Sequence, residues 1–256
     1  MKVVILAGGF GTRLSEETVI KPKPMVEIGE QPILWHIMKT YANYGFNEFV
    51  ILVGYKGQYI KDYFLNYHNR HNDFSINLKT NQLNTIRKNT EDWNVSLIDT
   101  GENTMTGGRI KRVQELIGNN QFLLTYGDGL SDINIPELIE YHNKHKGYVT
   151  MSAIQPEGRF GSLAIGDNGC INSFKEKPKG DGSWVNGGYF VCDPEVFNFI
   201  DGDDSIFERS PLELLAKEGR LFSKKHYGFW KCMDNINDKN NLNEMWKNNS
   251  ARWKTW

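Results

Sequence analysis

Glycines, cations and a hydroxyl gather in one short stretch near the beginning of the chain, directly after an apolar run. In chain order they are Gly8, Gly9, Gly11, Thr12, Arg13, Lys21 and Lys23. Without a Cβ, a glycine backbone can turn sharply and bring its N–H groups against a ligand. The hydroxyl, the guanidinium and the ammonium groups add further donors and positive charge. This combination favours the binding of a polyanion.

The two commonest nucleotide motifs do not match this stretch. A dinucleotide-binding fingerprint needs Gly or Ala three positions beyond Gly11, where Leu14 stands, and no Gly-Lys-Ser/Thr of a P-loop follows. A bare glycine cluster after a strand is often only a turn. The glycines by themselves therefore leave both a turn and a ligand-binding loop open.

A carboxylate stands at the end of another apolar run, because Asp128 follows residues 122–125 almost directly. Ligands of an open parallel sheet bind beyond the carboxyl ends of the strands, so Asp128 can reach the site opened by Gly8. Asp128 is our first candidate metal ligand. Asp132 is a weaker alternative, which we expect to lie in the turn or to cap the next helix.

Strands and helices alternate in the elements that must position these groups. Buried strands are predicted at residues 3–6, 48–54, 122–125 and 149–154, and an edge-type strand at residues 95–98. Helices are predicted at residues 33–44, 58–67, 136–142 and 204–217, and in the tail through Leu242, Met245 and Trp246. The polar segment 66–94 predicts strands and loop. Such alternation is typical of a parallel βαβ sheet.

Composition narrows the class of protein. A chain of 256 residues with 39% hydrophobic residues and no linker-like stretch predicts a single domain over residues 1–256. A net charge of −1 gives no electrostatic case for nucleic acid or an anionic membrane. The three cysteines lack a CxxC spacing and indicate neither a disulfide framework nor a zinc site. No apolar stretch approaches the ~20 residues that span a bilayer, so we expect a cytoplasmic protein.

The whole string GGFGTRL, followed by Lys23 and Pro24, closely resembles the signature of the sugar-1-phosphate nucleotidyltransferases. Later segments are similar to the family's EKP element, its N-[AG]-G-x-Y element and its tryptophan element, which here ends in Asp234. The run from Thr104 to Arg112, TMTGGRIKR, departs from the general family pattern and closely resembles the glucose-1-phosphate cytidylyltransferases within it. These motifs stand in the family's order and cover nearly the whole chain.

The resemblance implies a Rossmann-like three-layer α/β sandwich with a mainly parallel central sheet. It implies transfer of the cytidylyl group of CTP to α-D-glucose 1-phosphate, giving CDP-glucose and pyrophosphate and feeding dideoxyhexose and O-antigen (lipopolysaccharide) biosynthesis. It also implies Mg²⁺ as cofactor and a homo-oligomer, of which a hexamer is one form. The same reaction with UTP, dTTP or GTP, and a non-catalytic nucleotide-binding module, stay open as alternatives.

The family's functional residues carry over to matching positions. Arg13 would hold the departing pyrophosphate, Lys23 would contact the α-phosphate, and Lys177 would neutralise the phosphate of the sugar phosphate. Asp128 and Asp234 would hold Mg²⁺. The implied catalytic residues are Arg13, Lys23 and Asp128. The implied nucleotide-binding residues are Leu6, Ala7, Gly8, Gly9, Phe10, Gly11, Thr12, Arg13, Lys23, Thr104, Arg109 and Asp128. The implied sugar-phosphate residues are Glu176, Lys177, Asn186, Gly187 and Gly188.

Arg109 is predicted to read the base. Cytosine presents acceptors at N3 and O2, whereas uracil presents an N–H at N3, and a guanidinium group can only donate. Thr104 is expected to be an auxiliary contact. For Lys111 and Arg112 we expect the ordinary solvated basic face of a helix.

Overall fold

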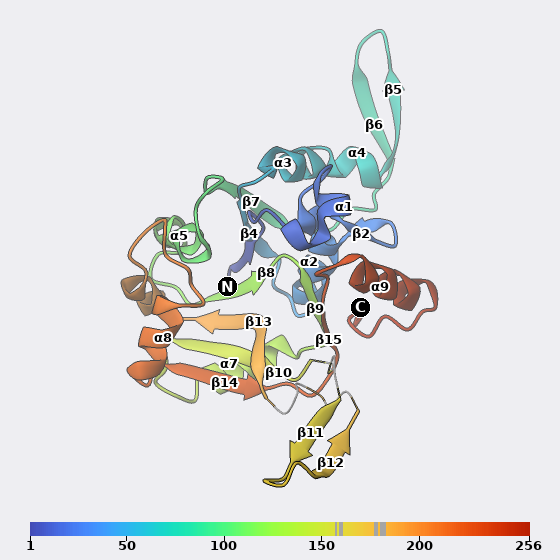
Figure 1. Ribbon diagram of the computed structural model, residues 1–256. Helices are drawn as coiled ribbons and strands as arrows, with labels where there is room; N and C mark the ends of the chain where they lie inside the picture. The colour runs from blue at the N-terminus through green and yellow to red at the C-terminus, as the bar shows by residue number, and fades with distance from the viewer. Residues whose placement is uncertain (157, 159–160, 177–178, 180–182) are drawn as a thin grey trace.

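The structure is a computed structural model that describes residues 1–156, 158, 161–176, 179 and 183–256, with the side chains of residues 13, 15 and 16 also outside the description. Its centre is a seven-stranded sheet in the order β14-β10-β13-β8-β1-β4-β7 (Figure 1). Neighbouring strands pair in parallel, except that β13 runs antiparallel to both β8 and β10. The sheet strands are β1 (Val3–Leu6), β4 (Glu48–Val53), β7 (Asn94–Asp99), β8 (Phe122–Tyr126), β10 (Val149–Ile154), β13 (Val185–Cys192) and β14 (Leu221–Lys225). The predicted mainly parallel sheet is confirmed.

Strand β1 shows why helices cover both faces of this sheet. Val3 and Ile5 belong to one buried cluster, and Val4 and Leu6 belong to the other. Successive side chains of a strand point to opposite faces, so a strand that is apolar at every position needs a layer on each side. The first layer holds α2 (Ile33–Ala42), α3 (Gly57–Leu65), α7 (Ile135–His142) and α9 (Ile236–Lys247). The second holds α5 (Thr106–Lys111), α6 (Gln114–Ile117), η4 (Pro194–Phe199) and α8 (Ser210–Lys217). The predicted three-layer sandwich is confirmed.

Short elements fill the loops around the sheet. They are η1 (Thr12–Leu14), α1 (Ser15–Thr18), η2 (Lys23–Met25), β2 (Glu27–Ile28), β3 (Gln31–Pro32), α4 (Tyr67–His71), β9 (Gly129–Ser131) and β15 (Trp230–Cys232). Strand β15 pairs antiparallel with β9 and brings the segment before Asp234 beside the end of β8. Within the described residues, no helix is long and apolar enough to cross a membrane.

Two helix starts differ from the sequence-based expectation. The cap of α7 is Asn134, whose side chain accepts from the N–H of Glu137. Asp132 instead accepts from the N–H of Phe229 and lies 3.0 Å from His226. Helix α8 begins at Ser210 and not at residue 204. In the turn before it, the carbonyls of Asp203 and Ser205 accept hydrogen bonds from backbone N–H groups at the beginning of α5 and so are not used in a helix.

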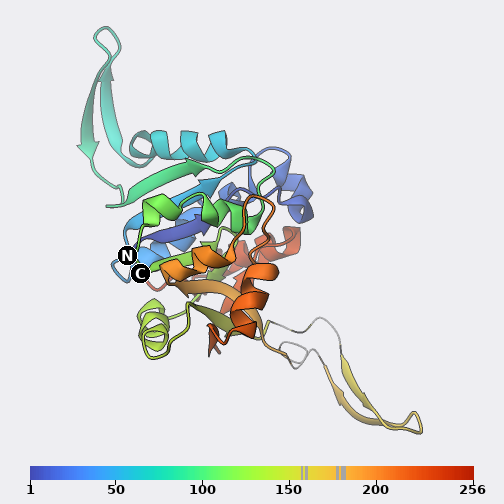
Figure 2. The same ribbon diagram turned by 90° about the vertical axis from the view of Figure 1, so that its left-hand side faces the viewer.

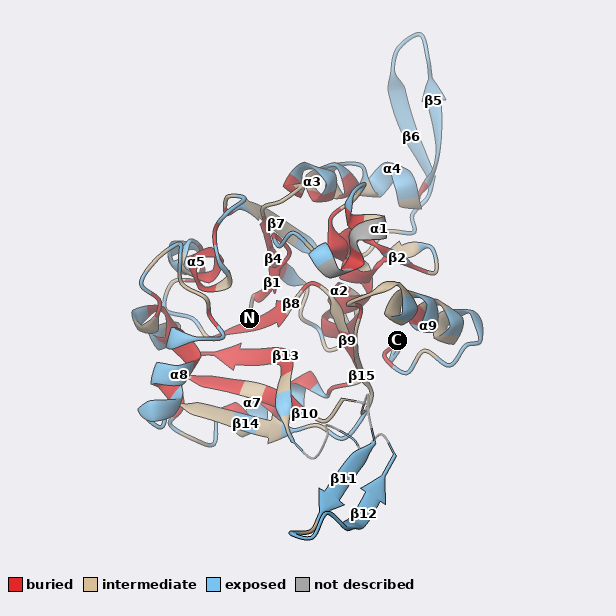
Figure 3. Ribbon diagram, in the orientation of Figure 1, coloured by how far each residue is buried: buried red, intermediate tan, exposed pale blue. Residues whose placement is uncertain are grey.

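Two hairpins project from opposite sides of the body (Figures 1 and 2). The first pairs β5 (Asp73–Asn77) with β6 (Gln82–Arg87), and the second pairs β11 (Ser162–Ile165) with β12 (Ile171–Lys175). Every residue of these strands is exposed, as the pale blue of Figure 3 shows. The expected strands and loop of segment 66–94 are confirmed, with α4 as an addition.

Candidate active site

A hollow of about 600 Å³ lies at the carboxyl ends of β1 and β8. Residues from the glycine loop, from the beginning of α5 and from the segment after β15 meet there, although they are far apart in the sequence. The predicted site residues that line it are Leu6, Ala7, Gly8, Gly9, Phe10, Gly11, Thr12, Lys23, Thr104, Arg109, Asp128, Asn186 and Asp234. The parallel sheet therefore brings most of the predicted site together.

The other predicted residues lie beside this hollow or outside the description. Gly187 and Gly188 line a small cavity of about 40 Å³ that shares Asp128 and Asn186 with the large one. Glu176 is exposed and follows the second hairpin directly. Lys177 and the side chain of Arg13 lie outside the described residues.

The glycine loop packs so closely against other residues of the chain that a Cβ at Gly8 or Gly11 would collide with them. Gly11 has a φ of +64°, which side-chain-bearing residues rarely adopt. A Cβ at Gly11 would lie 3.0 Å from the Cβ of Lys23. A Cβ at Gly8 would lie 2.3 Å from a guanidinium nitrogen of Arg109. The loop thus packs against Lys23 and Arg109, the two cations that the sequence analysis predicts beside a nucleotide.

Lys23 stands between two carboxylates. Its Nζ donates to Asp128 Oδ2 at 2.6 Å and to Asp234 Oδ1 at 2.8 Å. Burial works to lower the pKa of Lys23, but the charge of Asp128 and the hydrogen bonds to both carboxylates outweigh burial and hold the pKa above its usual value. The ammonium group is therefore charged, and it balances part of the negative charge of the pair.

Cys232 is a neighbour of this pair that the sequence analysis missed. One ligand atom each from Asp128, Cys232 and Asp234 lies within 4.8 Å of the others. Burial, and then the charge of Asp128, raise the pKa of the Cys232 thiol well above its usual value, so the thiol stays protonated. Cys232 ends β15, and its position only two residues before the predicted metal ligand Asp234 was an available signal.

Arg109 is buried at the wall of the hollow and binds the chain around it. Its Nη1 donates to Thr100 Oγ1 at 2.6 Å and to the Gly101 carbonyl at 2.7 Å. Its Nη2 donates to the carbonyls of Gly8 at 3.0 Å and Glu102 at 3.1 Å. These bonds use the four Nη hydrogens and tie the glycine loop to the turn after β7. Among the described residues, the guanidinium bonds of Arg109 run from Nη1 and Nη2 and not from the Nε–H.

Tyr126 and Glu208 connect Asn186, on the sugar-phosphate side of the predicted site, with the beginning of α5 on its nucleotide side. The sequence analysis missed both residues. The Tyr126 hydroxyl donates to Glu208 Oε1 at 2.6 Å and accepts from Asn186 Nδ2 at 3.2 Å. Thr106, at the beginning of α5, donates to the other oxygen of Glu208 at 2.6 Å. This network fixes Asn186 relative to the helix that carries Arg109. Glu208 gave no local signal because its partners are distant in sequence.

Gly188→Ala should be far more destabilising than Gly219→Ala, although both glycines have a positive φ, of +80° and +67°. A Cβ at Gly188 would meet the Tyr126 ring at 2.7 Å, whereas nothing lies within 4 Å of one at Gly219. We expect a loss of about 1–2 kcal/mol of unfolding free energy at Gly219 from backbone strain. At Gly188, overpacking should add about 1–3 kcal/mol. Urea unfolding measures both, and equal losses would contradict this account.

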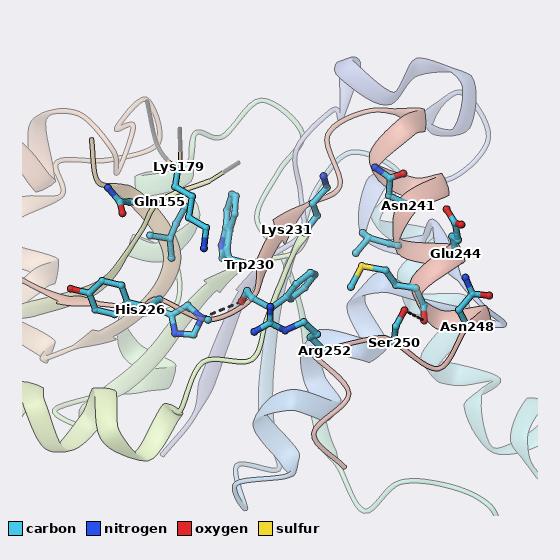
Figure 4. A pocket seen from close by; sticks show the side chains of 16 residues that line it. Gln155, Lys179, His226, Trp230, Lys231, Asn241, Glu244, Asn248, Ser250 and Arg252 are labelled. Carbon is cyan, nitrogen blue, oxygen red and sulfur yellow. Dashed lines mark hydrogen bonds between the residues drawn. The ribbon is translucent and has the colours of Figure 1, made fainter. Parts of the chain in front are cut away.

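A second hollow, of about 530 Å³, lies between β15 and α9 and shares Trp230 with the first (Figure 4). Two of its charged side chains pair with carboxylates: Arg252 lies 3.4 Å from Asp132, and Lys231 lies 3.4 Å from Asp238. Its His226 ring lies 3.1 Å from the Phe229 carbonyl, drawn as a dashed line in Figure 4. The glycine loop, Lys23 and the carboxylates of Asp128 and Asp234 line the first hollow and not this one.

Comparison with known proteins gives the family. The family model described as nucleotidyl transferase matches residues 2–226. The glucose-1-phosphate cytidylyltransferase of Salmonella typhi is 51% identical over 100% of both chains, and the probable glucose-1-phosphate cytidylyltransferase of Bacillus subtilis is 44% identical over the same share. The crystal structure of HddC from Yersinia pseudotuberculosis complexed with GMP-PN has a TM-score of 0.70 at 24% identity, covering 96% of this chain and 99% of that one. The chain belongs to the nucleotidyl transferase family, and the resemblance to glucose-1-phosphate cytidylyltransferases is confirmed.

Proposed function

We propose that the protein transfers the cytidylyl group of CTP to α-D-glucose 1-phosphate, giving CDP-glucose and pyrophosphate. The observation that carries the proposal is the convergence of the glycine loop, Lys23, Asp128 and Asp234 in one hollow. Two relatives that match this chain over 100% of both sequences bear the name of this activity. The product would feed dideoxyhexose and O-antigen synthesis in the cytoplasm. The two hydrophobic clusters pack on opposite faces of one sheet, which supports a single domain over residues 1–256.

The chemistry of the reaction suits the residues of the hollow. The attacking group is an oxygen of the sugar phosphate, which is already ionised near neutral pH, so no general base is needed. The difficulty is to bring two polyanions together in line, which calls for positioning and for opposite charge. Lys23 would neutralise the α-phosphate, Arg13 the departing pyrophosphate and Lys177 the phosphate of the acceptor.

Mg²⁺ is the cofactor that the donor set fits. Asp128 and Asp234 offer carboxylate oxygens, the ligands that Mg²⁺ prefers, and the hollow leaves room for water and phosphate oxygens to complete the shell. When bound, the ion would stabilise the negative charge that develops on the phosphate oxygens. Asn186, Gly187 and Gly188, held beside Tyr126, would contact the sugar, and Glu176 would reach it from the second hairpin.

One assay tests this proposal against its alternatives. The purified protein is given CTP, UTP, dTTP or GTP with glucose 1-phosphate or another hexose 1-phosphate in the presence of Mg²⁺, and pyrophosphate release is measured. We expect the highest kcat/KM for CTP with glucose 1-phosphate. A higher value with another nucleotide would change the assignment of the base. CTP binding without turnover on any sugar phosphate would instead favour the non-catalytic nucleotide-binding module.

We also propose a homo-oligomer, in which a second copy covers the apolar faces of the two hairpins. The register places Leu163 opposite Phe174, and Ile76 opposite Leu83, with all four side chains exposed. An isolated two-stranded hairpin is at best marginally stable in water, so a covering surface is expected. Two such hairpins on opposite sides of the folded chain suit a closed ring of copies, of which a hexamer is one form.

Phe174→Asp should therefore shift the protein toward monomer, because it places a charge within the proposed contact face. Ser173→Asp is the matched control, since Ser173 pairs with Ala164 on the opposite face of the same hairpin. Size-exclusion chromatography with light scattering at micromolar concentration measures the mass. A monomeric wild-type protein, or an equal effect of both substitutions, would contradict the proposal.

A further inference from the structure

The ammonium group of Lys23 is bound by the same two carboxylates that would hold the metal. Its Nζ lies 2.6 Å from Asp128 Oδ2 and 2.8 Å from Asp234 Oδ1, and the Lys23 side chain is 11% exposed. A Mg²⁺ ion bound to both oxygens would lie at about 2.1 Å from each. An ammonium and a divalent ion on one oxygen pair would be two cations in close contact that share the same two anionic oxygens. We propose that Lys23 competes with the divalent metal for this carboxylate pair until a nucleotide phosphate takes over the ammonium group.

The local charge supports this competition, which rests on the proposed function. The carboxylates of Asp128 and Asp234 and the ammonium of Lys23 together carry a net charge of −1, so a divalent ion added to these three groups would bring them to +1 in a partly buried place. Unbalanced charge away from water is costly. The phosphates of a nucleotide bring the negative charge that allows both cations to stay. The metal should therefore bind weakly to the protein without nucleotide.

The position of Lys23 allows the transfer. Its backbone is fixed in η2 between Pro22 and Pro24, and its Cβ and Cδ lie 3.0 and 3.7 Å from where a Cβ of Gly11 would be. The stem thus runs along the glycine loop. A phosphate seated on that loop would be within reach of the ammonium group after rotation about the outer bonds of the side chain, with the backbone unmoved.

Two consequences follow for the order of binding. Each ligand should strengthen the binding of the other by the same factor, because coupling between sites is reciprocal. The free protein should keep its carboxylate pair partly neutralised without depending on the metal concentration. Lys23 would then act on the metal before it acts on the nucleotide.

The experiment measures Mn²⁺ binding to the full chain without nucleotide, by the loss of the free Mn²⁺ signal in electron paramagnetic resonance. The variants are Lys23→Met, which has no charge, and Lys21→Met as the matched control. Lys21 pairs with Glu27 at 3.2 Å and does not line the hollow. We expect Lys23→Met to bind Mn²⁺ about tenfold or more tightly than the wild type, within the usual range of coupling. Lys21→Met should bind like the wild type.

Further variants locate the gain and guard against misfolding. Adding Asp234→Asn to Lys23→Met should remove the gain, because the ion then loses one anionic ligand. Lys23→Gln provides a second, polar replacement, and in both Lys23 variants Mn²⁺ should raise the melting temperature more than in the wild type. Equal Mn²⁺ affinity of the wild type, Lys21→Met and both Lys23 variants would overturn the inference.

The turnover of the wild-type protein separates this inference from the proposed function. Formation of CDP-glucose together with no gain in Mn²⁺ affinity would refute the competition alone. A gain in Mn²⁺ affinity together with no turnover on any nucleotide would refute the function and leave the competition standing.

Discussion

Asp128→Asn should lower kcat for CDP-glucose formation by about 100-fold or more, which is the largest effect that we expect from one substitution. The amide keeps the shape of the side chain but removes one of the two proposed anionic ligands of the metal, whose charge stabilisation amounts to several kcal/mol. At about 1.4 kcal/mol for each factor of ten, such a loss exceeds 100-fold. Steady-state assays at saturating substrates and Mg²⁺ measure it, and Asp234→Asn should behave in the same way.

Asp132→Asn is the matched control for this prediction. Asp132 lies four residues beyond Asp128, but its oxygens bind the Phe229 N–H and lie near His226 and Arg252, outside the first hollow. It should therefore keep most of the activity, while circular dichroism shows that all three variants are folded. Near-normal turnover of Asp128→Asn, or an equal loss in Asp132→Asn, would refute the assignment of Asp128 as metal ligand.

Arg109→Met should lower both kcat/KM for CTP and the stability of the glycine loop. The carbonyls of Gly101 and Glu102 would lose their guanidinium donor, whereas the Gly8 carbonyl would keep the N–H of Tyr55. Because both bonds are only partly buried, we expect their loss to cost about 0.5–1.5 kcal/mol each. If the Nε–H meets N3 or O2 of cytosine, the CTP-to-UTP ratio of kcat/KM should narrow by about tenfold to a few hundredfold. The KM for glucose 1-phosphate should change little.

Arg112→Met controls for the loss of an arginine from the same helical segment. Arg112 pairs with Asp203 at 2.6 Å at the surface, away from the hollow, and an exposed ion pair contributes little to stability. Kinetics with both nucleotides and thermal unfolding of both variants give the comparison. If Arg109→Met loses activity on CTP and UTP in equal proportion, Arg109 only shapes the loop. Selectivity would then come from backbone groups around Gly8 and Gly107.

The sequence determined the layers of the fold because their signal is local. An apolar residue at every position of β1 requires cover on both faces, and helical spacing in α2 supplies one of the covers. The glycine loop and its following cations were equally visible, since the turn, the donors and the charges lie within one stretch. The predicted strands β1, β4, β8 and β10 are confirmed to within a residue or two.

Only the tertiary structure decided how the charged groups of the site are paired. Lys23 is 105 residues from Asp128 and 211 from Asp234, and no local pattern states that the three meet. Their contact depends on the sheet order, which sets the end of β8 beside β1, and on β15, which carries Asp234 back to the same edge. Hydrogen bonds between residues far apart in the sequence also occupy the Nη groups of Arg109 and link Tyr126 to Glu208. Residue types therefore predicted a site for polyanions. Packing determined which donors remain for the ligand, because buried polar groups form hydrogen bonds with partners that the fold brings near them.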